Sequence, residues 1–280
     1  MAARQSQGPG PTAGVHVIDT GTATLIPDRD RPRGWMLLVN GVESSHADLD
    51  DPEWLEFEYL RWTAAVIEDT FPPGSAPAVL HLGAAGCSLA RHLLVTRPGS
   101  RHLAVDIDAR LAALVRDWFE LPRAPLLRIR IGDARAVLES LPDNSRDVVV
   151  RDVFAGDTTP ADLLTDGFVA QVRRVLRPGG LYLLNCADRP SLELTRREVA
   201  TLATAFGTVA LTADPPMLKG RRRGNVVVVG SDVPVGGPAL TRQLLAGAVP
   251  AHWWPPDEVA TFARRAEPWR DPVVVDPEGD

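Results

Sequence analysis

The sequence has only two cysteines, Cys87 and Cys186, among its 280 residues. Their number and spacing fit neither a metal-binding motif nor a disulfide framework. Both lie in or next to segments predicted to form the core, where a small buried thiol is ordinary. The sequence therefore predicts no metal centre.

Long hydrophobic runs are also absent. No apolar stretch approaches the roughly 20 residues that a membrane-spanning helix requires, so we expect no membrane partner. Residues 1–14 are rich in glycine, proline, alanine and glutamine and contain no apolar signal core. We expect this segment to be a disordered tail and the protein to be cytoplasmic.

The chain carries no excess of positive charge. Its 30 basic and 36 acidic residues give a net charge of −6. This balance argues against broad nucleic-acid binding and is compatible with a cationic substrate. With 45% apolar residues, the chain is long enough for one large α/β domain and a smaller unit.

The most informative stretch is residues 79–88, Val-Leu-His-Leu-Gly-Ala-Ala-Gly-Cys-Ser. It has the pattern of a buried strand that runs into a turn, with Gly83, Ala84 and Gly86, and then into a helix. Glycines allow the backbone to turn sharply and to approach a ligand closely, and we expect Ser88 to cap the helix. A Gly-x-x-Gly turn alone is weak evidence, because many such turns only connect a strand to a helix.

Three later strands end in or beside an aspartate. Asp106 follows the strand at 102–105, about 20 residues after the glycine turn, which is the spacing of an acid that binds a ribose hydroxyl pair. Asp133 follows a strand at 127–131, and Asp152 follows one at 147–150. Open parallel sheets bind ligands at the carboxyl ends of their strands. The alternative is that these aspartates only cap helices.

Strands alternate with helices of 10–15 residues, which predicts an α/β fold with a doubly wound, mostly parallel sheet. We expect a small antiparallel β unit at 15–50, where Asn40-Gly41 indicates a hairpin. The main domain at 51–231 should open with a helix from Asp51-Pro52-Glu53 to about Thr70. Residues 232–280 should form an extension with short helices and an acidic tail. The seven expected strands of the main sheet lie near 79–82, 102–106, 127–131, 147–150, 181–185, 208–211 and 225–230.

These motifs, from Thr22 to Ser231, resemble the class I S-adenosylmethionine-dependent transferases, whose fold is a seven-stranded Rossmann-like sheet. Within them, the sequence is most similar to the spermidine synthase-like, or aminopropyltransferase, branch. The motifs that carry the resemblance are the glycine turn, Val-Asp-Ile-Asp at 105–108, Gly-Asp-Ala-Arg at 132–135, Arg-Pro-Gly-Gly at 177–180, and Leu-Val-Asn-Gly-Val-Glu-Ser at 38–44 followed by Asp50-Asp51.

The sequence departs from the branch in several places. The glycine turn lacks the family's aspartate, and Glu43 takes the place of its hairpin glutamine. The family's Tyr-His-Glu segment appears as Tyr59-Leu60-Arg61. Its Asp-Ser-x-Asp-Pro loop appears as residues 152–160, in which Asp152 aligns directly and Asp157 aligns only across an insertion.

The resemblance implies a role for each matching residue. The backbone of Gly83, Ala84 and Gly86 would approach the nucleoside near its sulfonium. Asp106, with Ile107 beside it, would bind the ribose hydroxyls, and Asp133 with Ala134 would bind the adenine. Asp152 would lie between the sulfonium and the acceptor, and Asp152 or Asp157 would be the general base or cation anchor.

Three functions stay open. The first is transfer of an aminopropyl group from decarboxylated S-adenosylmethionine to a polyamine. The second is methyl transfer from S-adenosylmethionine to a small molecule, and the third is a non-catalytic nucleoside-binding protein. The resemblance implies an amine as the small-molecule substrate and a possible homodimer. We expect core or surface roles for His46 and His81. The basic residues 219–223 should form a solvated loop, with an anionic acceptor or a nucleic-acid contact as the alternative.

Overall fold

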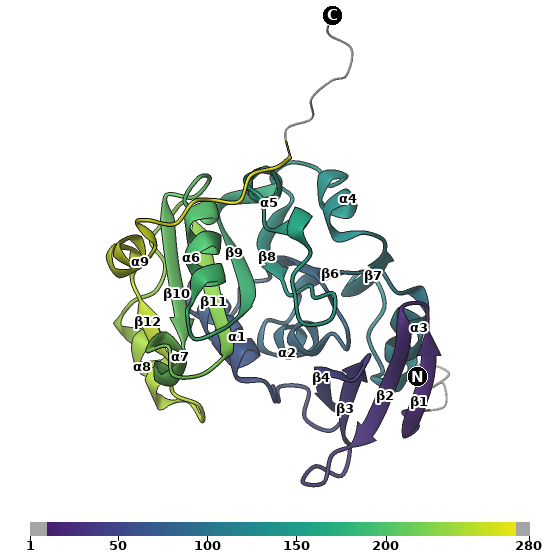
Figure 1. Ribbon diagram of the computed structural model, residues 1–280. Helices are drawn as coiled ribbons and strands as arrows, with labels where there is room; N and C mark the ends of the chain where they lie inside the picture. Colours follow the sequence, from purple (N-terminus) through teal and green to yellow (C-terminus); the bar gives the residue numbers. More distant parts are fainter. Residues whose placement is uncertain (1–9, 273–280) are drawn as a thin grey trace, which may run out of the picture.

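The computed structural model describes residues 10–272 and contains two sheets (Figure 1). The small sheet is antiparallel, in the order β1-β2-β3-β4. Its strands are β1 (Gly14–Ile18), β2 (Gly21–Pro27), β3 (Gly34–Val39) and β4 (Val42–Asp48). It confirms the predicted N-terminal β unit. Residues 1–9 of the tail predicted for residues 1–14, and residues 273–280 of the acidic tail, lie outside the described residues.

The large sheet has eight strands in the order β12-β10-β11-β9-β8-β5-β6-β7. Their bounds are β5 (Ala78–Leu82), β6 (Arg101–Asp106), β7 (Leu127–Ile131), β8 (Arg146–Arg151), β9 (Leu176–Asp188), β10 (Thr208–Ala213), β11 (Gly224–Ser231) and β12 (His252–Trp254). Strands β7, β6, β5, β8 and β9 pair in parallel, whereas β11 is antiparallel to both β9 and β10. The predicted doubly wound sheet is thus confirmed, and β12 adds an eighth strand at its edge.

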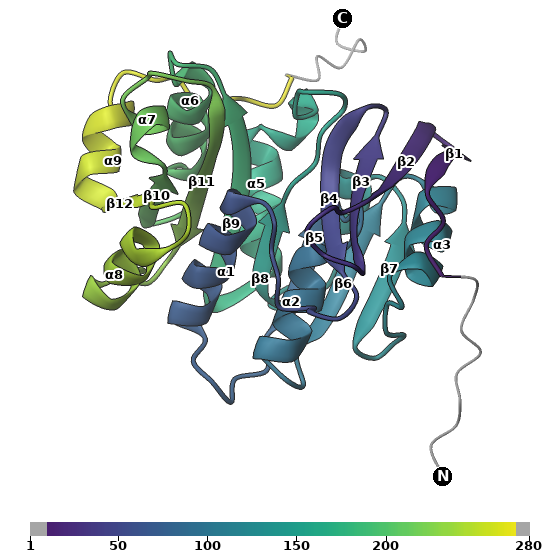
Figure 2. The ribbon, with the colours of Figure 1, turned by 90° about the horizontal axis from the view of Figure 1, so that it is seen from below.

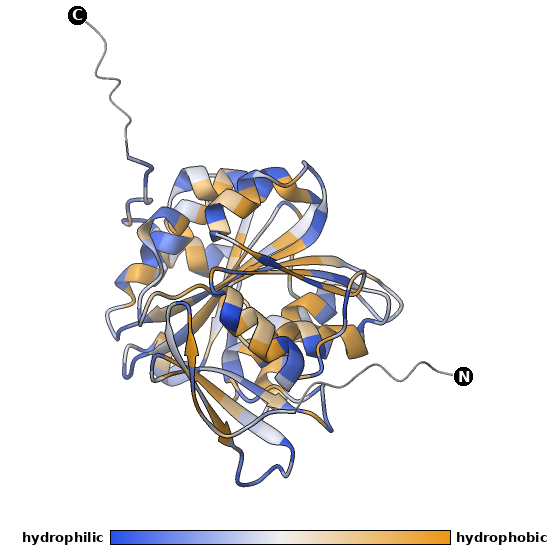
Figure 3. Cartoon of the chain, turned by 90° about the vertical axis from the view of Figure 1, so that its right-hand side faces the viewer, coloured by the Kyte–Doolittle hydropathy of each residue, from blue (hydrophilic) through white to orange (hydrophobic). Residues whose placement is uncertain are grey.

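Helices cover both faces of this sheet, as Figure 2 shows. Their bounds are α1 (Glu58–Thr70), α2 (Ser88–Thr96), α3 (Ala109–Trp118), α4 (Ala134–Glu139), α5 (Asp166–Val175), α6 (Glu193–Leu202), α7 (Pro215–Leu218), α8 (Pro238–Ala246) and α9 (Pro256–Ala263), with a 3-10 turn η1 (Ala161–Leu163). Helix α1 packs against α2 and α8, and α6 packs against α5 and α9. Figure 3 shows that the strands between these layers are largely hydrophobic. Burial of these apolar strand residues is the main term that stabilises the fold.

Helix α1 begins at Glu58, so the helix start predicted at Asp51 is wrong. The Asp48 carboxylate accepts the backbone N–H groups of Asp50 (2.9 Å) and Asp51 (3.2 Å), which holds the chain in a turn. The Arg31 guanidinium then lies 3.4 Å from the centre of the Trp54 ring. The Asp48 hydrogen bonds satisfy two backbone N–H groups of the segment in a non-helical conformation.

The small sheet packs on the large domain through a core of its own, shared with α2, α3 and the strands β6 and β7. It includes Leu25, Leu37, Ala90, Leu111, Val115, Trp118 and Leu127, all buried. Asp108 adds a polar link, because its Oδ2 accepts both the backbone N–H (2.7 Å) and the hydroxyl (2.8 Å) of Thr20. The boundaries predicted at residues 50 and 231 stay predictions.

A fully buried ion pair joins the middle of the large sheet to α6. Arg151, the last residue of β8, binds Glu198 of α6, and Arg151 Nη1 also donates to the carbonyl of Leu163 at 2.7 Å. Burial raises the pKa of Glu198, and the charge of Arg151 opposes this shift. A buried pair of this kind is costly to break because the remaining charge is left without a partner.

We therefore expect Arg151→Met and Glu198→Leu each to lower the free energy of unfolding by about 3–5 kcal/mol. The double variant Arg151→Met/Glu198→Leu, which removes both charges, should be less destabilised than either single variant. Urea denaturation followed by circular dichroism measures all three. Additive losses in the double variant would show that the two side chains are not energetically coupled.

Candidate active site at the carboxyl ends of the strands

The order of the strands reverses at the end of β5. The chain passes from β5 to β6 and β7 on one side, and then crosses to β8 on the other side of β5. Ligands of open α/β sheets bind at this kind of reversal, outside the carboxyl ends of the strands. Here the backbone N–H of Asp152 donates to Leu82 (2.8 Å) and that of Gly83 to Val105 (3.1 Å). The glycine turn therefore starts at the reversal point.

Gly83 is required at this position for two reasons. Its φ of +79° lies in the left-handed region, which disfavours side chains. A Cβ atom on Gly83 would also lie 2.2 Å from the carbonyl oxygen of Asp152. The absence of a side chain thus lets the ends of β5 and β8 approach each other.

The rest of the turn is held by the small sheet. The backbone N–H of Gly86 donates to Ser45 Oγ at 2.9 Å. The expectation that Ser88 caps α2 is wrong, because Cys87 occupies the cap position in a left-handed conformation and Ser88 is the first helical residue. The hydroxyl of Ser88 donates instead to the carbonyl of His46, at 2.6 Å.

Asp106 faces the turn from the end of β6. Its Oδ2 accepts the N–H of Ala85 (3.2 Å) and its Oδ1 accepts that of Asp108 (2.9 Å). Burial raises the pKa of Asp106. The helix that follows is capped by Asp108, whose Oδ1 accepts the N–H of Leu111 at 2.7 Å. Asp106 is therefore not a helix cap, and the Ile107 side chain beside it is exposed.

Asp133 caps helix α4, which is the alternative role that the sequence leaves open for these aspartates. Its Oδ1 accepts the N–H of Ala136 in α4, at 2.8 Å. Asp133 is exposed, and Ala134, the first residue of α4, is buried. The N–H of Gly132 donates to the carbonyl of Asp106 at 2.9 Å, so Asp106 and Asp133 lie at neighbouring strand ends.

Asp152 is held by two hydrogen-bond donors. The hydroxyl of Tyr59 donates to Oδ2 (2.8 Å) and the side-chain amide of Asn185 donates to Oδ1 (3.0 Å). Burial raises the pKa of Asp152, and both hydrogen bonds act in the opposite direction. Burial also raises the pKa of Tyr59 well above its ordinary value, so its hydroxyl stays protonated as a donor.

Asn185 is a candidate functional residue that the sequence interpretation missed. Its position near the end of β9, the strand next to β8, is the signal that could have found it. The buried Oδ1 of Asn185 has no hydrogen-bond partner among residues 10–272. An unpaired buried acceptor beside a carboxylate suits a ligand that donates hydrogen bonds.

Asp157, the second predicted acid, makes no contact with a described residue that would hold it beside Asp152. Asp157 is exposed and lies in a tight turn that is closed by a hydrogen bond of 2.8 Å from Ala155 N–H to Thr158. It makes no hydrogen bond to any described residue. Glu43, aligned with the family's hairpin glutamine, is exposed as well.

The two histidines that the sequence singles out have buried structural partners. His81 contacts His102 at 2.9 Å, and His102 contacts Ser100 Oγ at 2.8 Å. Burial lowers the pKa of His102 to about 4, so this pair is neutral. His46 is also buried and lies 2.8 Å from Asp28. Both histidines therefore have core roles, one of the two roles expected for them.

The basic loop between α7 and β11 is exposed, as the sequence predicts. Arg222 pairs with Asp214, the residue that caps α7. Lys219, Arg221 and Arg223 do not pair with any residue between 10 and 272.

The residues at the strand ends are suited to binding and to proton transfer. Asp106 and Asp152 contact the glycine turn from two sides, and each retains a raised pKa. Across residues 10–272, no group of three or more histidines, cysteines or acids is arranged to hold a metal ion. Over the same residues, no helix is both long and apolar enough to cross a bilayer.

This sheet order and the glycine turn at its reversal point define the class of S-adenosylmethionine-dependent transferases. Residues 80–184 match the family model described as "Methyltransferase domain". The "probable spermidine synthase" of Corynebacterium glutamicum ATCC 13032 superimposes with a TM-score of 0.90 at 42% identity, over 95% of this chain and 99% of that chain. The chain therefore belongs to the spermidine synthase family.

More distant matches share the fold or part of the sequence. The spermidine synthase of Thermotoga maritima shares the fold, with a TM-score of 0.61 at 15% identity over 92% of this chain and 84% of that chain. The polyamine aminopropyltransferase of Vibrio vulnificus (strain CMCP6) is 27% identical over 171 residues, which are 60% of this chain and 56% of that protein. The match thus spans little more than half the length of this curated relative.

The close contact at Gly83 gives a direct test of the site. We expect Gly83→Ala to displace the end of β8 and to reduce the affinity for S-adenosylhomocysteine at least about tenfold, measured by isothermal titration calorimetry. Gly99→Ala is the matched control, because Gly99 also has a positive φ (+90°) but has room for a Cβ, 3.5 Å from the nearest side chain. Equal affinity in the two variants would contradict the proposed location of the nucleoside.

Proposed function

We propose that this protein transfers an aminopropyl group from decarboxylated S-adenosylmethionine to an amine of a small polyamine. The observation that carries the proposal is the carboxylate of Asp152, fixed by Tyr59 and Asn185 where the sheet order reverses. Membership of the spermidine synthase family supports the reaction type. A protonated amine is the kind of substrate that a half-buried carboxylate and the unpaired Oδ1 of Asn185 would attract.

The nucleoside would lie along the ends of β5, β6 and β7. In this proposal the backbone of Gly83, Ala84 and Gly86 faces the sulfonium end. Asp106 accepts hydrogen bonds from the ribose hydroxyls, and the exposed Ile107 covers the adenine. The free carboxylate oxygen of Asp133 accepts from the adenine amino group, near the N–H of Ala134.

The chemistry is a displacement at carbon. The lone pair of the acceptor amine forms a new C–N bond with the aminopropyl carbon, and the C–S bond to the sulfonium breaks. The leaving group is the neutral thioether 5′-methylthioadenosine. Because the sulfonium is already a good leaving group, the protein contributes chiefly position and electrostatics.

The acceptor must lose a proton before it attacks, because free amines have a pKa near about 10. We assign proton acceptance to Asp152, whose raised pKa makes it a stronger base than a solvated aspartate. Asp157 would act as a second anchor for the cationic acceptor, contributed by the exposed loop that follows β8.

Methyl transfer from S-adenosylmethionine is the second candidate. It is favoured by the glycine turn, in which residues 84–87 carry no acid that would repel the carboxylate of the intact co-substrate. The two candidates differ in the mass that the acceptor gains. Mass spectrometry after incubation with each nucleoside and putrescine distinguishes them.

We expect Asp152→Asn to lower the rate of transfer by about 100-fold or more, since it removes the base but keeps the size of the side chain. Binding of 5′-methylthioadenosine, measured by calorimetry, should be nearly unchanged. The matched control is Asp143→Asn on the exposed loop before β8, which should retain full activity. Full turnover by the Asp152 variant would remove this residue from the mechanism.

The Tyr59 hydrogen bond predicts a pH effect. Its hydroxyl lowers the pKa of Asp152, so Tyr59→Phe should raise that pKa further. Because the base must be ionised, activity is lost as the pH falls through this pKa, and the acidic limb of the kcat/KM profile should move to higher pH in the variant. An unchanged acidic limb would show that the group titrating in the profile is not Asp152.

A further inference from the structure

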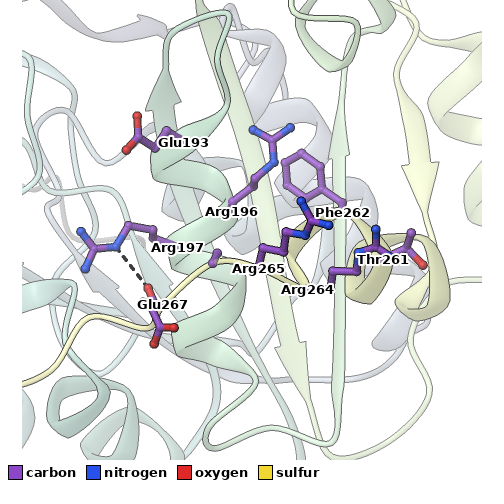
Figure 4. A pocket seen from close by; sticks show the side chains of 9 residues that line it. Glu193, Arg196, Arg197, Thr261, Phe262, Arg264, Arg265 and Glu267 are labelled. Atoms are coloured by element: carbon purple, nitrogen blue, oxygen red, sulfur yellow. Dashed lines mark hydrogen bonds between the residues drawn. The ribbon is translucent and has the colours of Figure 1, made fainter.

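A second cleft lies between α6 and α9, apart from the strand ends described above (Figure 4). Its volume is about 480 Å³, which is the size of a small-molecule site. None of the residues assigned above to nucleoside or acceptor lines it. Its charged lining residues are Glu193, Arg196, Arg197, Arg264, Arg265 and Glu267.

The cleft concentrates positive charge in a protein whose net charge is −6. Four arginines line it against two glutamates. Arg264 and Arg265 are exposed and form no ion pair with any residue in the described part of the chain. Because the positive charges of these arginines repel one another, binding of an anion between them is favourable.

Two of the arginines are held in fixed positions by aromatic rings. The Arg196 guanidinium lies 4.4 Å from the centre of the Phe262 ring. Arg197 lies 3.3 Å from the centre of the Trp269 ring, and its Nε donates to the carbonyl of Glu267 at 3.1 Å. Figure 4 shows this hydrogen bond on one side of the cleft and the Phe262 ring on the other.

These contacts leave several guanidinium N–H groups of the cleft free to donate hydrogen bonds to a ligand. The two Nη atoms of Arg197 make no hydrogen bond to residues 10–272, and neither do the guanidinium groups of Arg264 and Arg265. A planar guanidinium binds phosphate oxygens through two parallel hydrogen bonds. Guanidinium groups that are already stacked lose less side-chain entropy when a ligand binds.

We propose that this cleft binds a small phosphorylated molecule, with Arg196, Arg197, Arg264 and Arg265 as ligands of its phosphate groups. The four guanidiniums and two carboxylates leave two positive charges, which matches an anion with at least two negative charges. The size of the cleft favours a small molecule over nucleic acid. The inference does not depend on the transferase reaction.

The probe is inorganic pyrophosphate, titrated into the full-length protein by isothermal calorimetry at low ionic strength. We expect saturable binding with one site per chain. The variant Arg264→Gln/Arg265→Gln should bind about tenfold more weakly or worse, since each arginine contributes charge-assisted hydrogen bonds. Both side chains are exposed, so the variant should keep the melting temperature of the parent protein.

The control Arg101→Gln/Arg242→Gln removes the same charge from exposed positions outside the cleft. Its affinity for pyrophosphate should stay within about twofold of the parent, because distant surface charges are screened. Saturating 5′-methylthioadenosine should not displace pyrophosphate, since the two sites are separate. The proposal is overturned if the parent protein does not bind pyrophosphate, if both double variants lose affinity equally, or if citrate binds as tightly as pyrophosphate.

Discussion

The candidate active site depends on how closely two central strands approach at their carboxyl ends. Gly83 directly follows β5, and Asp152 directly follows β8. The space between the backbones of these two residues is too small for a methyl group. This contact directs the chain that follows β5 past the carboxylate at the end of β8. Binding of the nucleoside and the acceptor side by side requires that the loops after β5 and β8 start from this common point.

Around this contact, the acids at the strand ends have different local roles. Asp133 stabilises the start of a helix, whereas Asp106 and Asp152 accept hydrogen bonds while their burial disfavours ionisation. The energetic cost of these two carboxyls is offset by neighbours on other elements: the turn amide of Ala85, and the side chains of Tyr59 and Asn185. Carboxyls with perturbed pKa values cluster at functional sites.

Much of the sheet could be predicted from the sequence because its buried parallel strands are short apolar runs between turns and helices. All seven expected strands are present, and β12 was missed because the three residues at 252–254 are too short for any periodicity to show. The start of α1 was placed too early because Asp-Pro-Glu at 51–53 is typical of a helix start. The contacts of Asp48 and Arg31 that override this local preference come from the small sheet.

For the candidate site, the aspartates could be identified from the sequence, but their hydrogen-bond partners could not. Asp106 and Asp152 stand out because each follows an apolar strand. The partnership of Tyr59, Asn185 and Asp152 joins residues up to 126 positions apart and cannot be derived from local patterns. Likewise, Cys87 rather than Ser88 occupies the cap of α2, because the hydroxyl of Ser88 is bound to β4.

The segment that matches the general methyltransferase domain is held by contacts with residues that precede it. It begins at residue 80, yet the amide of Gly86 and the carboxylate of Asp108 are bound by Ser45 and Thr20, which precede it. Truncation before residue 50 would leave these polar groups without partners and would uncover the apolar residues beneath the small sheet. The N-terminal β unit thus supplies hydrogen bonds that hold the glycine turn and the start of α3.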